Sequence, residues 1–361
     1  MTAPTTSTVY AYIGSYAEAE DPSVYACAFD AETGRLTLLQ QTSGLINPTF
    51  LAIDPVRRTL LAIAEDRGPA GERLGAAVAY AIDERTGELT FRNRQATVAA
   101  STCHIMLDHS RRSFAVASYS GSRIGLSRME DDGSAGPATD THMHEGSGIR
   151  PQQDKPHPHS VFFDPANRFA LVPDLGIDRI VVYRLDLEQL KLVPHGETAV
   201  AAGAGPRHFV FHPTAPYGYV INELNSTVTA FVYDGDLGRL TEIESVTTLP
   251  SGYEGNNATA DIHISPDGRF LYGSNRGHDS IVVYAIDAAT GRLSLIEHVS
   301  SGGGHPRNFG LSPDGRFLLA ANRDSDNVVT FARDAATGKL QPTGDELRVS
   351  KPVCVKFFNV N

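Results

Sequence analysis

Residues Gly304–Leu340 read GHPRNFGLSPDGRFLLAANRDSDNVVTFARDAATGKL, and this stretch decides the fold. It contains three short runs rich in apolar, aromatic and β-branched residues, NFGLS, RFLLAAN and NVVTFAR. A Pro-Asp-Gly turn and a polar Ser-Asp segment separate them, and an Ala-Thr-Gly turn leads into a fourth run. Such runs between turn residues are the local signature of an antiparallel meander.

The same unit recurs along the chain. Asp261–Leu293 reads DIHISPDGRFLYGSNRGHDSIVVYAIDAATGRL, and weaker copies begin near Pro48, Thr102, Pro158 and Pro206. A proline in the first turn marks the period of about fifty residues, at Pro55, Pro165, Pro213, Pro266 and Pro313, with His109 taking its place in one copy. All-strand units that repeat at this period predict a β-propeller in which each unit is a four-stranded blade.

The two ends of the sequence complete the count of blades. Val9–Leu36 matches the unit from its second strand onward, whereas Lys351–Asn359, KPVCVKFFN, matches the missing first strand. We therefore predict an all-β, seven-bladed propeller whose C-terminal strand joins the N-terminal blade and closes the ring. The whole chain, 1–361, is expected to form this one domain, with residues 1–8 as a polar tail.

Composition limits the partners and the compartment. The net charge of −11 argues against general affinity for nucleic acid or for anionic membrane surfaces. No apolar run approaches the roughly 20 residues that span a bilayer, and MTAPTTST lacks the features of a secretory signal. Three cysteines give no disulfide framework, so a cytoplasmic location is expected. The oligomeric state is left open.

The repeat register predicts which residues surround the central axis. Antiparallel pairing places the start of each first strand beside the end of the second, at one mouth of the propeller. Six residues before the marker, the start positions are Thr49, Cys103, His159, Arg207, Ala260 and Arg307, with Val353 as a looser match. Ten residues after it, the partner positions are Glu65, Tyr119, Leu175, Glu223, Arg276 and Arg323, with Tyr16 from the first blade.

This register gathers four guanidinium groups, a carboxylate and an imidazole at one mouth. An excess of arginine over carboxylate favours a small anionic ligand, because the guanidinium fork matches carboxylate or phosphate. Ion pairs from blade to blade, such as Arg207 with Glu223, are the structural alternative.

Other motifs carry less functional information. His157-Pro158-His159 fits either a metal pair or a simple strand entry, and His142-Met143-His144 is interpreted as part of a surface loop. The glycine clusters at 203–205 and 302–304 precede strands rather than helices, which argues against phosphate loops. The segment Gly133–Lys155 is interpreted as an insertion that caps a mouth.

The motifs GPRHFVFHP, YVINEL, SNRGHDSIVVY and HPRNFGLSPDGRFLLAAN resemble those of the seven-bladed lactonase family. That family includes propeller-type 6-phosphogluconolactonases and a fungal 3-carboxy-cis,cis-muconate cyclase, and the resemblance runs from about Tyr10 to Phe358. It implies that His159, Arg207, Glu223 and Arg276 are the catalytic residues at the central mouth. We add Arg307, Arg323, Glu65 and His208 as predicted substrate-binding residues. The resemblance implies no cofactor, and no metal site is expected.

The leading hypothesis is hydrolysis of an anionic sugar-acid lactone, either 6-phosphogluconolactone or an aldonic or aldaric lactone. Arg207 and Arg276 would hold the anionic group or stabilise the oxyanion, and either Glu223 or His159 would activate water. We expect Glu223 to be ionised and His159 to titrate near neutrality. The alternatives are muconate-type lactonising cyclisation and a non-catalytic propeller that serves as an interaction scaffold.

Overall fold

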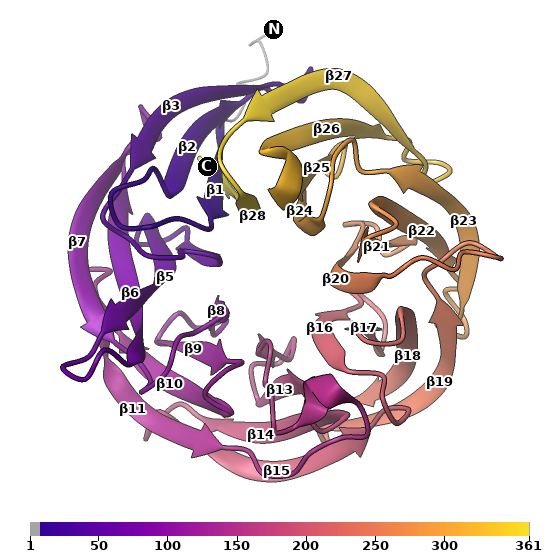
Figure 1. Cartoon of the computed structure of the whole chain (residues 1–361), viewed down its shortest axis with the longest axis horizontal. Helices are drawn as coiled ribbons and strands as arrows, with labels where there is room; N and C mark the ends of the chain where they lie inside the picture. Colours follow the sequence, from indigo (N-terminus) through magenta and orange to yellow (C-terminus); the bar gives the residue numbers. More distant parts are fainter. Residues whose placement is uncertain (1–7, 361) are drawn as a thin grey trace, which may run out of the picture.

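Seven four-stranded antiparallel sheets form a ring, which confirms the predicted propeller (Figure 1). The computed structural model describes residues 8–360, so the predicted polar tail lies outside the described residues except for Thr8. In each blade the strand nearest the axis is the first of the repeat unit, and the fourth strand lies at the rim (Figure 1).

Four strands make up each blade, in the following order from the axis outward. Blade 1 contains β28 (Pro352–Asn359), β1 (Val9–Ser15), β2 (Val24–Phe29) and β3 (Leu36–Thr42); blade 2 contains β4 (Leu51–Asp54), β5 (Thr59–Arg67), β6 (Arg73–Ile82) and β7 (Leu89–Ala96). Blade 3 contains β8 (His104–Leu107), β9 (Ser113–Ser118), β10 (Arg123–Met129) and β11 (Ala135–Met143); blade 4 contains β12 (Phe162–Phe163), β13 (Phe169–Asp174), β14 (Arg179–Asp186) and β15 (Lys191–Ala199). Blade 5 contains β16 (Pro206–Phe211), β17 (Tyr217–Asn222), β18 (Thr227–Asp234) and β19 (Arg239–Thr247); blade 6 contains β20 (Ala258–Ile264), β21 (Phe270–Arg276), β22 (Ser280–Ile286) and β23 (Leu293–Ser300). Blade 7 contains β24 (Pro306–Leu311), β25 (Phe317–Asn322), β26 (Asn327–Arg333) and β27 (Leu340–Arg348), and the two short 3₁₀ helices are η1 (Pro151–Gln153) and η2 (Arg323–Ser325).

The ring closes through the pairing of β28 with β1. These antiparallel strands run in register from Val9 opposite Asn359 to Gly14 opposite Cys354. In Figure 1 the yellow end of the chain therefore lies against its indigo beginning. The prediction that the C-terminal strand completes the N-terminal blade is confirmed.

The core lies between neighbouring blades, because both faces of each sheet are covered. Along β1, Val9, Ala11 and Ile13 pack against blade 7, whereas Tyr10 and Tyr12 pack against blade 2. Alternate residues of a strand point to opposite faces, so a strand buried on both faces is apolar throughout its length.

Tyrosine hydroxyls tie several neighbouring blades together. Tyr12 donates to the carbonyl of Gly87 at 2.9 Å, and Tyr219 donates to Gly291 at 2.9 Å in the same way. Gly87 has a φ of 75° in its turn, and a Cβ there would lie 2.4 Å from the ring of Tyr10. The Thr-Gly turn of one blade therefore closes directly over the aromatic face of the blade before it.

The first half of the segment Gly133–Lys155 is not an insertion, and that part of the prediction was wrong. This half contains β11, the outer strand of blade 3, whose polar sequence reflects its place at the rim. His144 follows this strand and is buried: its Nδ1 bonds Asp174 at 2.6 Å and its Nε2 bonds the Tyr183 hydroxyl at 3.0 Å. The surface-loop interpretation was therefore wrong for His144, which joins blade 3 to blade 4.

Candidate active site

Irregularities in the innermost strands aim side chains toward the axis. The pairing of β16 with β17 shifts between Pro206 and His208, and that of β24 with β25 shifts between Pro306 and Asn308. The residues at these shifts are Arg207 and Arg307. A β-bulge bends its strand and re-aims the side chain that it adds. The arginines at the predicted start positions are thus placed by bulges rather than by regular pleating.

A cavity of about 290 Å³ lies at this mouth of the ring. Many of its wall residues were predicted from the register: Thr49, Cys103, His159 and Arg307 from the start positions, and Tyr16, Glu65, Tyr119 and Glu223 from the partner positions. The register positions did not include the remaining wall residues, which lie in connections between strands (Asn47, Ser101, Thr102 and Ser120) or at the first position of β6 (Arg73).

Glu223 is the carboxylate around which the deeper wall is built. It follows β17, and its backbone N–H donates to the Gly205 carbonyl at 2.7 Å. Its Oε2 accepts hydrogen bonds from Arg207 Nε and from Arg276 Nη2, both at 2.8 Å. The side chain of Arg207 is 2% exposed and that of Glu223 is 19% exposed, so the carboxylate faces the cavity and the arginine lies behind it.

Both arginines are also held by main-chain carbonyls. Arg276 donates to Ala258 at 3.1 Å and to Thr259 at 2.7 Å, and Arg207 donates to Ala260. These bonds and the shared carboxylate fix the orientation of both guanidinium groups. The predicted Arg207–Glu223 ion pair is therefore present, but it lies within blade 5 rather than between blades, and Arg276 extends it to blade 6.

The charges of this cluster determine its protonation. Burial raises the pKa of Glu223, but Arg276, Arg207 and Arg307 outweigh burial and hold that pKa below its usual 4.5. Burial, with the neighbouring Arg276 and Arg307, lowers the pKa of Arg207 to about 9. At neutral pH the carboxylate is ionised, as predicted, and the guanidinium groups are charged.

His159 lies beside this cluster as a neutral imidazole. Burial and the cationic Arg207 lower its pKa well below 6.5, so the expectation that it titrates near neutrality was wrong. Its Nδ1 is buried and has no hydrogen-bond partner within residues 8–360. Its backbone carbonyl accepts a hydrogen bond from Cys103 Sγ at 3.2 Å, and its ring meets Tyr119 edge-on.

Arg307 is the accessible cation of the cavity. Its guanidinium carbon lies 5.5 Å from the centre of the Tyr16 ring, and it forms no ion pair with any described residue. Arg323 has a different environment, because it lies in η2 after β25 and donates to Asp324 at 2.6 Å. It does not line the cavity.

The opposite wall carries a second carboxylate. Glu65 accepts a hydrogen bond from Asn47 Nδ2 at 3.2 Å and pairs with Arg73 at 3.5 Å. This pair is neutral overall. The Arg207–Glu223–Arg276 cluster together with Arg307 therefore gives the cavity an excess of positive charge.

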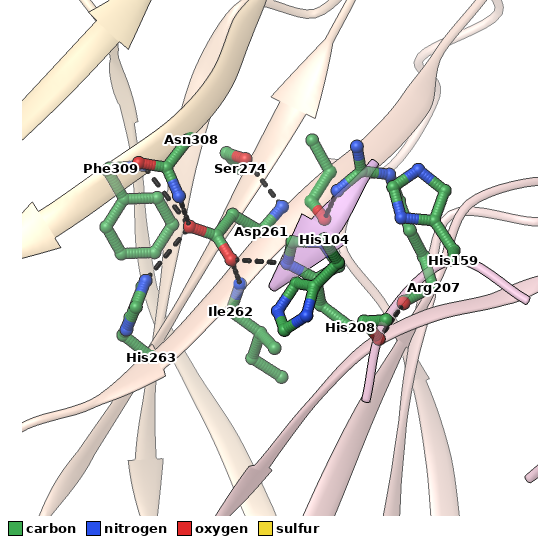
Figure 2. A network of polar contacts seen from close by, with 12 residues as sticks. His104, His159, Arg207, His208, Asp261, Ile262, His263, Ser274, Asn308 and Phe309 are labelled. Carbon is green, nitrogen blue, oxygen red and sulfur yellow. Dashed lines mark hydrogen bonds and ion pairs between the residues drawn. The ribbon is translucent and has the colours of Figure 1, made fainter. Parts of the chain in front are cut away.

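His208 lies below the cavity, in a buried network around Asp261 (Figure 2). Asp261 accepts hydrogen bonds from His208 Nδ1 at 2.8 Å and His263 Nε2 at 2.9 Å, and also from the Asn308 side chain (Figure 2). The rings of His208 and His159 have centres 5.3 Å apart. His208 thus packs under the cavity rather than lining it.

The described residues were also searched for a metal site and for a helix that could span a membrane. Within residues 8–360 no group of three or more His, Cys, Asp or Glu side chains is arranged to hold a metal ion. Over the same range, no helix has the length and apolarity that crossing a membrane requires.

Comparison with known proteins places this chain in a family. A family model described as "Lactonase, 7-bladed beta-propeller" matches residues 10–357. The chain belongs to the seven-bladed β-propeller lactonase family. A lactonase-type hydrolase related to 6-phosphogluconolactonases was expected, and this assignment is confirmed at the level of the family.

Individual relatives agree with this assignment. The chain is 35% identical to a 6-phosphogluconolactonase of Bacillus subtilis over 298 residues, covering 82% of this chain and 83% of the relative. A putative 6-phosphogluconolactonase of Bacteroides fragilis superposes with a TM-score of 0.89 at 32% identity, covering 99% of both chains. A periplasmic gluconolactonase of Pseudomonas aeruginosa superposes with a TM-score of 0.91 at 31% identity, covering 98% of this chain and 100% of that one. Since this last relative is periplasmic, the cytoplasmic location stays a prediction.

Proposed function

We propose that this lactonase hydrolyses an anionic sugar-acid lactone, with 6-phosphogluconolactone as the first candidate and aldonic or aldaric lactones next. The observation that carries the proposal is an ionised carboxylate, Glu223, that faces a polar cavity beside Arg307, a cation without an ion-pair partner among the described residues. The cavity, at about 290 Å³, is of the size that binds small metabolites.

Arg307 is the group proposed to hold the anionic substituent of the lactone. A guanidinium binds phosphate or carboxylate through paired hydrogen bonds, and that of Arg307 lines the cavity. Arg207 and Arg276 already bond Glu223 and main-chain carbonyls. We therefore propose that these two arginines position Glu223. Their positive charges also favour, at longer range, the oxyanion of the tetrahedral intermediate.

Glu223 is proposed as the general base. Only its Oε2 bonds the two arginines, so Oε1 remains to accept a proton from the attacking water. Water adds to the lactone carbonyl as Glu223 takes its proton, the ring C–O bond breaks, and the leaving alkoxide takes that proton back from Glu223. His159 is neutral and lines the same cavity, and we assign its imidazole to orienting the water and the leaving oxygen.

The charge distribution also bears on the two alternatives. Muconate-type cyclisation requires several cations for a polycarboxylate, whereas Arg207 and Arg276 share one carboxylate and Arg323 bonds Asp324 outside the cavity. This arrangement favours hydrolysis of a lactone over cyclisation of a polycarboxylate. A scaffold without catalysis would not need an ionised carboxylate maintained beside a polar cavity.

The test is a hydrolysis screen with a pH indicator over phosphorylated, aldonic and aldaric lactones. Spontaneous opening is subtracted with a no-enzyme control and with Glu223→Gln. Faster turnover of anionic lactones than of neutral ones supports the proposal. Loss of carboxymuconate absorbance without hydrolysis of any lactone would favour the cyclase instead.

A further inference from the structure

The central channel contains a second and larger cavity, of about 540 Å³. Its walls are the later residues of the innermost strands, including Ile53, Leu107 and Phe211. Each strand advances about 3.3 Å per residue, so these side chains lie well below the start positions at the candidate active site. No described residue lines both cavities.

The walls of this second cavity are mainly apolar. Phe50, Met106, Phe162 and Phe211 contribute aromatic and thioether surface to it. A sugar lactone would leave its hydroxyl groups without partners on such walls, at a cost in free energy. The cavity therefore suits a different chemical class of ligand from the one proposed for the active site.

Only two formally charged side chains, among those described, lie in the wall of this cavity. One is Asp261, which is 3% exposed and already accepts bonds from His208, His263 and Asn308. The other is Lys356 of β28, whose Nζ lies 4.6 Å from the centre of the Phe50 ring. Within residues 8–360 Lys356 forms no ion pair, so the cavity offers one cation and no competing free carboxylate.

Five imidazoles line the same wall, those of His104, His109, His208, His212 and His263. His208 donates from Nδ1 to the Asp261 carboxylate, so its Nε2 carries a lone pair, and this atom is buried without a partner among the described residues (Figure 2). His104 accepts the Val161 N–H on Nδ1 at 3.4 Å. Both histidines line the cavity. A buried acceptor without a partner costs free energy unless a donor satisfies it, and a water beside the ligand, rather than a carboxylate, has the proton to donate.

We propose that this cavity is a second ligand site, and that its ligand is a small monocarboxylate with an apolar body. The carboxylate pairs with Lys356, and the body packs on Phe50, Phe162 and Phe211. A neutral apolar molecule leaves the ammonium unpaired, and a polyanion finds no second cation among the described wall residues. The single cation and the apolar walls together favour a ligand with one carboxylate and an apolar chain or ring.

Octanoate is the probe for this site, measured by calorimetric titration of the whole protein. Wild-type protein should bind it saturably, with one equivalent per chain. Lys356→Met should weaken octanoate about tenfold or more, because the charge-assisted contact is lost. The same variant should bind 1-octanol as wild type does and should hydrolyse lactones at the wild-type rate, which shows that the fold is intact.

Two further variants separate this cavity from the active site and from the general surface. Val210→Trp places a large side chain in the cavity wall and should abolish binding of both octanoate and 1-octanol. Arg307→Met should leave octanoate affinity unchanged, as should Lys191→Met, which removes an exposed lysine of β15. Absence of saturable octanoate binding at millimolar concentration would overturn the proposal. So would binding that is lost in Arg307→Met or retained in Lys356→Met.

Discussion

Arg207 Nε donates to Oε2 of Glu223 at 2.8 Å, from the bulge at the start of β16 to the residue that follows β17 in the same blade. Arg276 reaches the same oxygen from the neighbouring blade. One oxygen of the carboxylate thus anchors two blades while the residue still lines the cavity. The side chain of Glu223 thus links two blades and is also the proposed general base.

Replacement of Glu223 by Gln should remove the general base. We expect kcat for the best lactone to fall by about 10²–10⁴, the range typical of acid–base groups. Glu65→Gln is the matched control, since Glu65 is the other carboxylate of the cavity and pairs with Arg73. It should change KM more than kcat. A Glu223→Gln protein with wild-type kcat would contradict the assignment.

Arg307 and Arg323 come from the start and the partner position of the same blade but have different environments, so they form a natural pair of test sites. Arg307→Met should raise KM for a phosphorylated lactone about tenfold to a hundredfold, because the guanidinium lines the cavity. Arg323→Met should have little effect, since that side chain bonds Asp324 outside it. Steady-state kinetics with a neutral gluconolactone provides the second control, in which both variants should behave alike.

The pH dependence of catalysis should follow Glu223 rather than His159. The pKa of Glu223 is held below 4.5 and that of His159 well below 6.5, so neither group changes protonation at neutral pH. After subtraction of spontaneous hydrolysis, kcat/KM should be flat between about pH 5.5 and 7.5 and fall only in more acidic solution. A titration with a midpoint near 6.5 would show instead that His159 carries an essential proton.

Folding stability should decrease on acidification before the carboxylates titrate. The pKa of His208 is lowered by burial and Arg207 from 6.5 to about 4, so between these values the unfolded chain binds the proton and the folded chain does not. The free energy of unfolding therefore does not depend on this group above about pH 6.5. Below that pH the group lowers the free energy of unfolding, by up to about 1.4 kcal/mol per pH unit. Burial of His159 and His104 acts in the same direction.

Urea unfolding at pH 7 and pH 5 measures this effect. The wild-type free energy of unfolding should be lower at pH 5. His208→Phe should reduce the difference between the two pH values, whereas substitution of the exposed His109 by Gln should leave it unchanged. Equal stability of the wild type at both pH values would contradict the burial of neutral imidazoles.

The repeat register predicted the positions of the central residues better than their directions. The spacing from Pro165 and Pro213 placed His159 and Glu223 at one mouth, and the structure confirms that both line the cavity. Spacing fixes where an α-carbon lies but not where a long side chain points. Arg323 was predicted for the mouth, yet the 3₁₀ turn that follows β25 leads its guanidinium to Asp324.

Residues outside the repeat could not be predicted in this way. Asn47 and Thr102 reach the cavity from the connections that precede β4 and β8, which the two register positions do not include. His144 shows a related difficulty, because its partners Asp174 and Tyr183 belong to the next blade. Contacts between blades depend on how two units pack, and a single unit does not encode that packing.

The pairing of β28 with β1 also has a consequence for synthesis of the chain. β1 emerges first, but the strand that covers its inner edge, Pro352–Asn359, is made more than three hundred residues later. Until then blade 1 has an open edge, and open edges invite pairing with other chains. A chain that stops before Pro352 keeps this edge, so the ring closes only after the strand Pro352–Asn359 has been made.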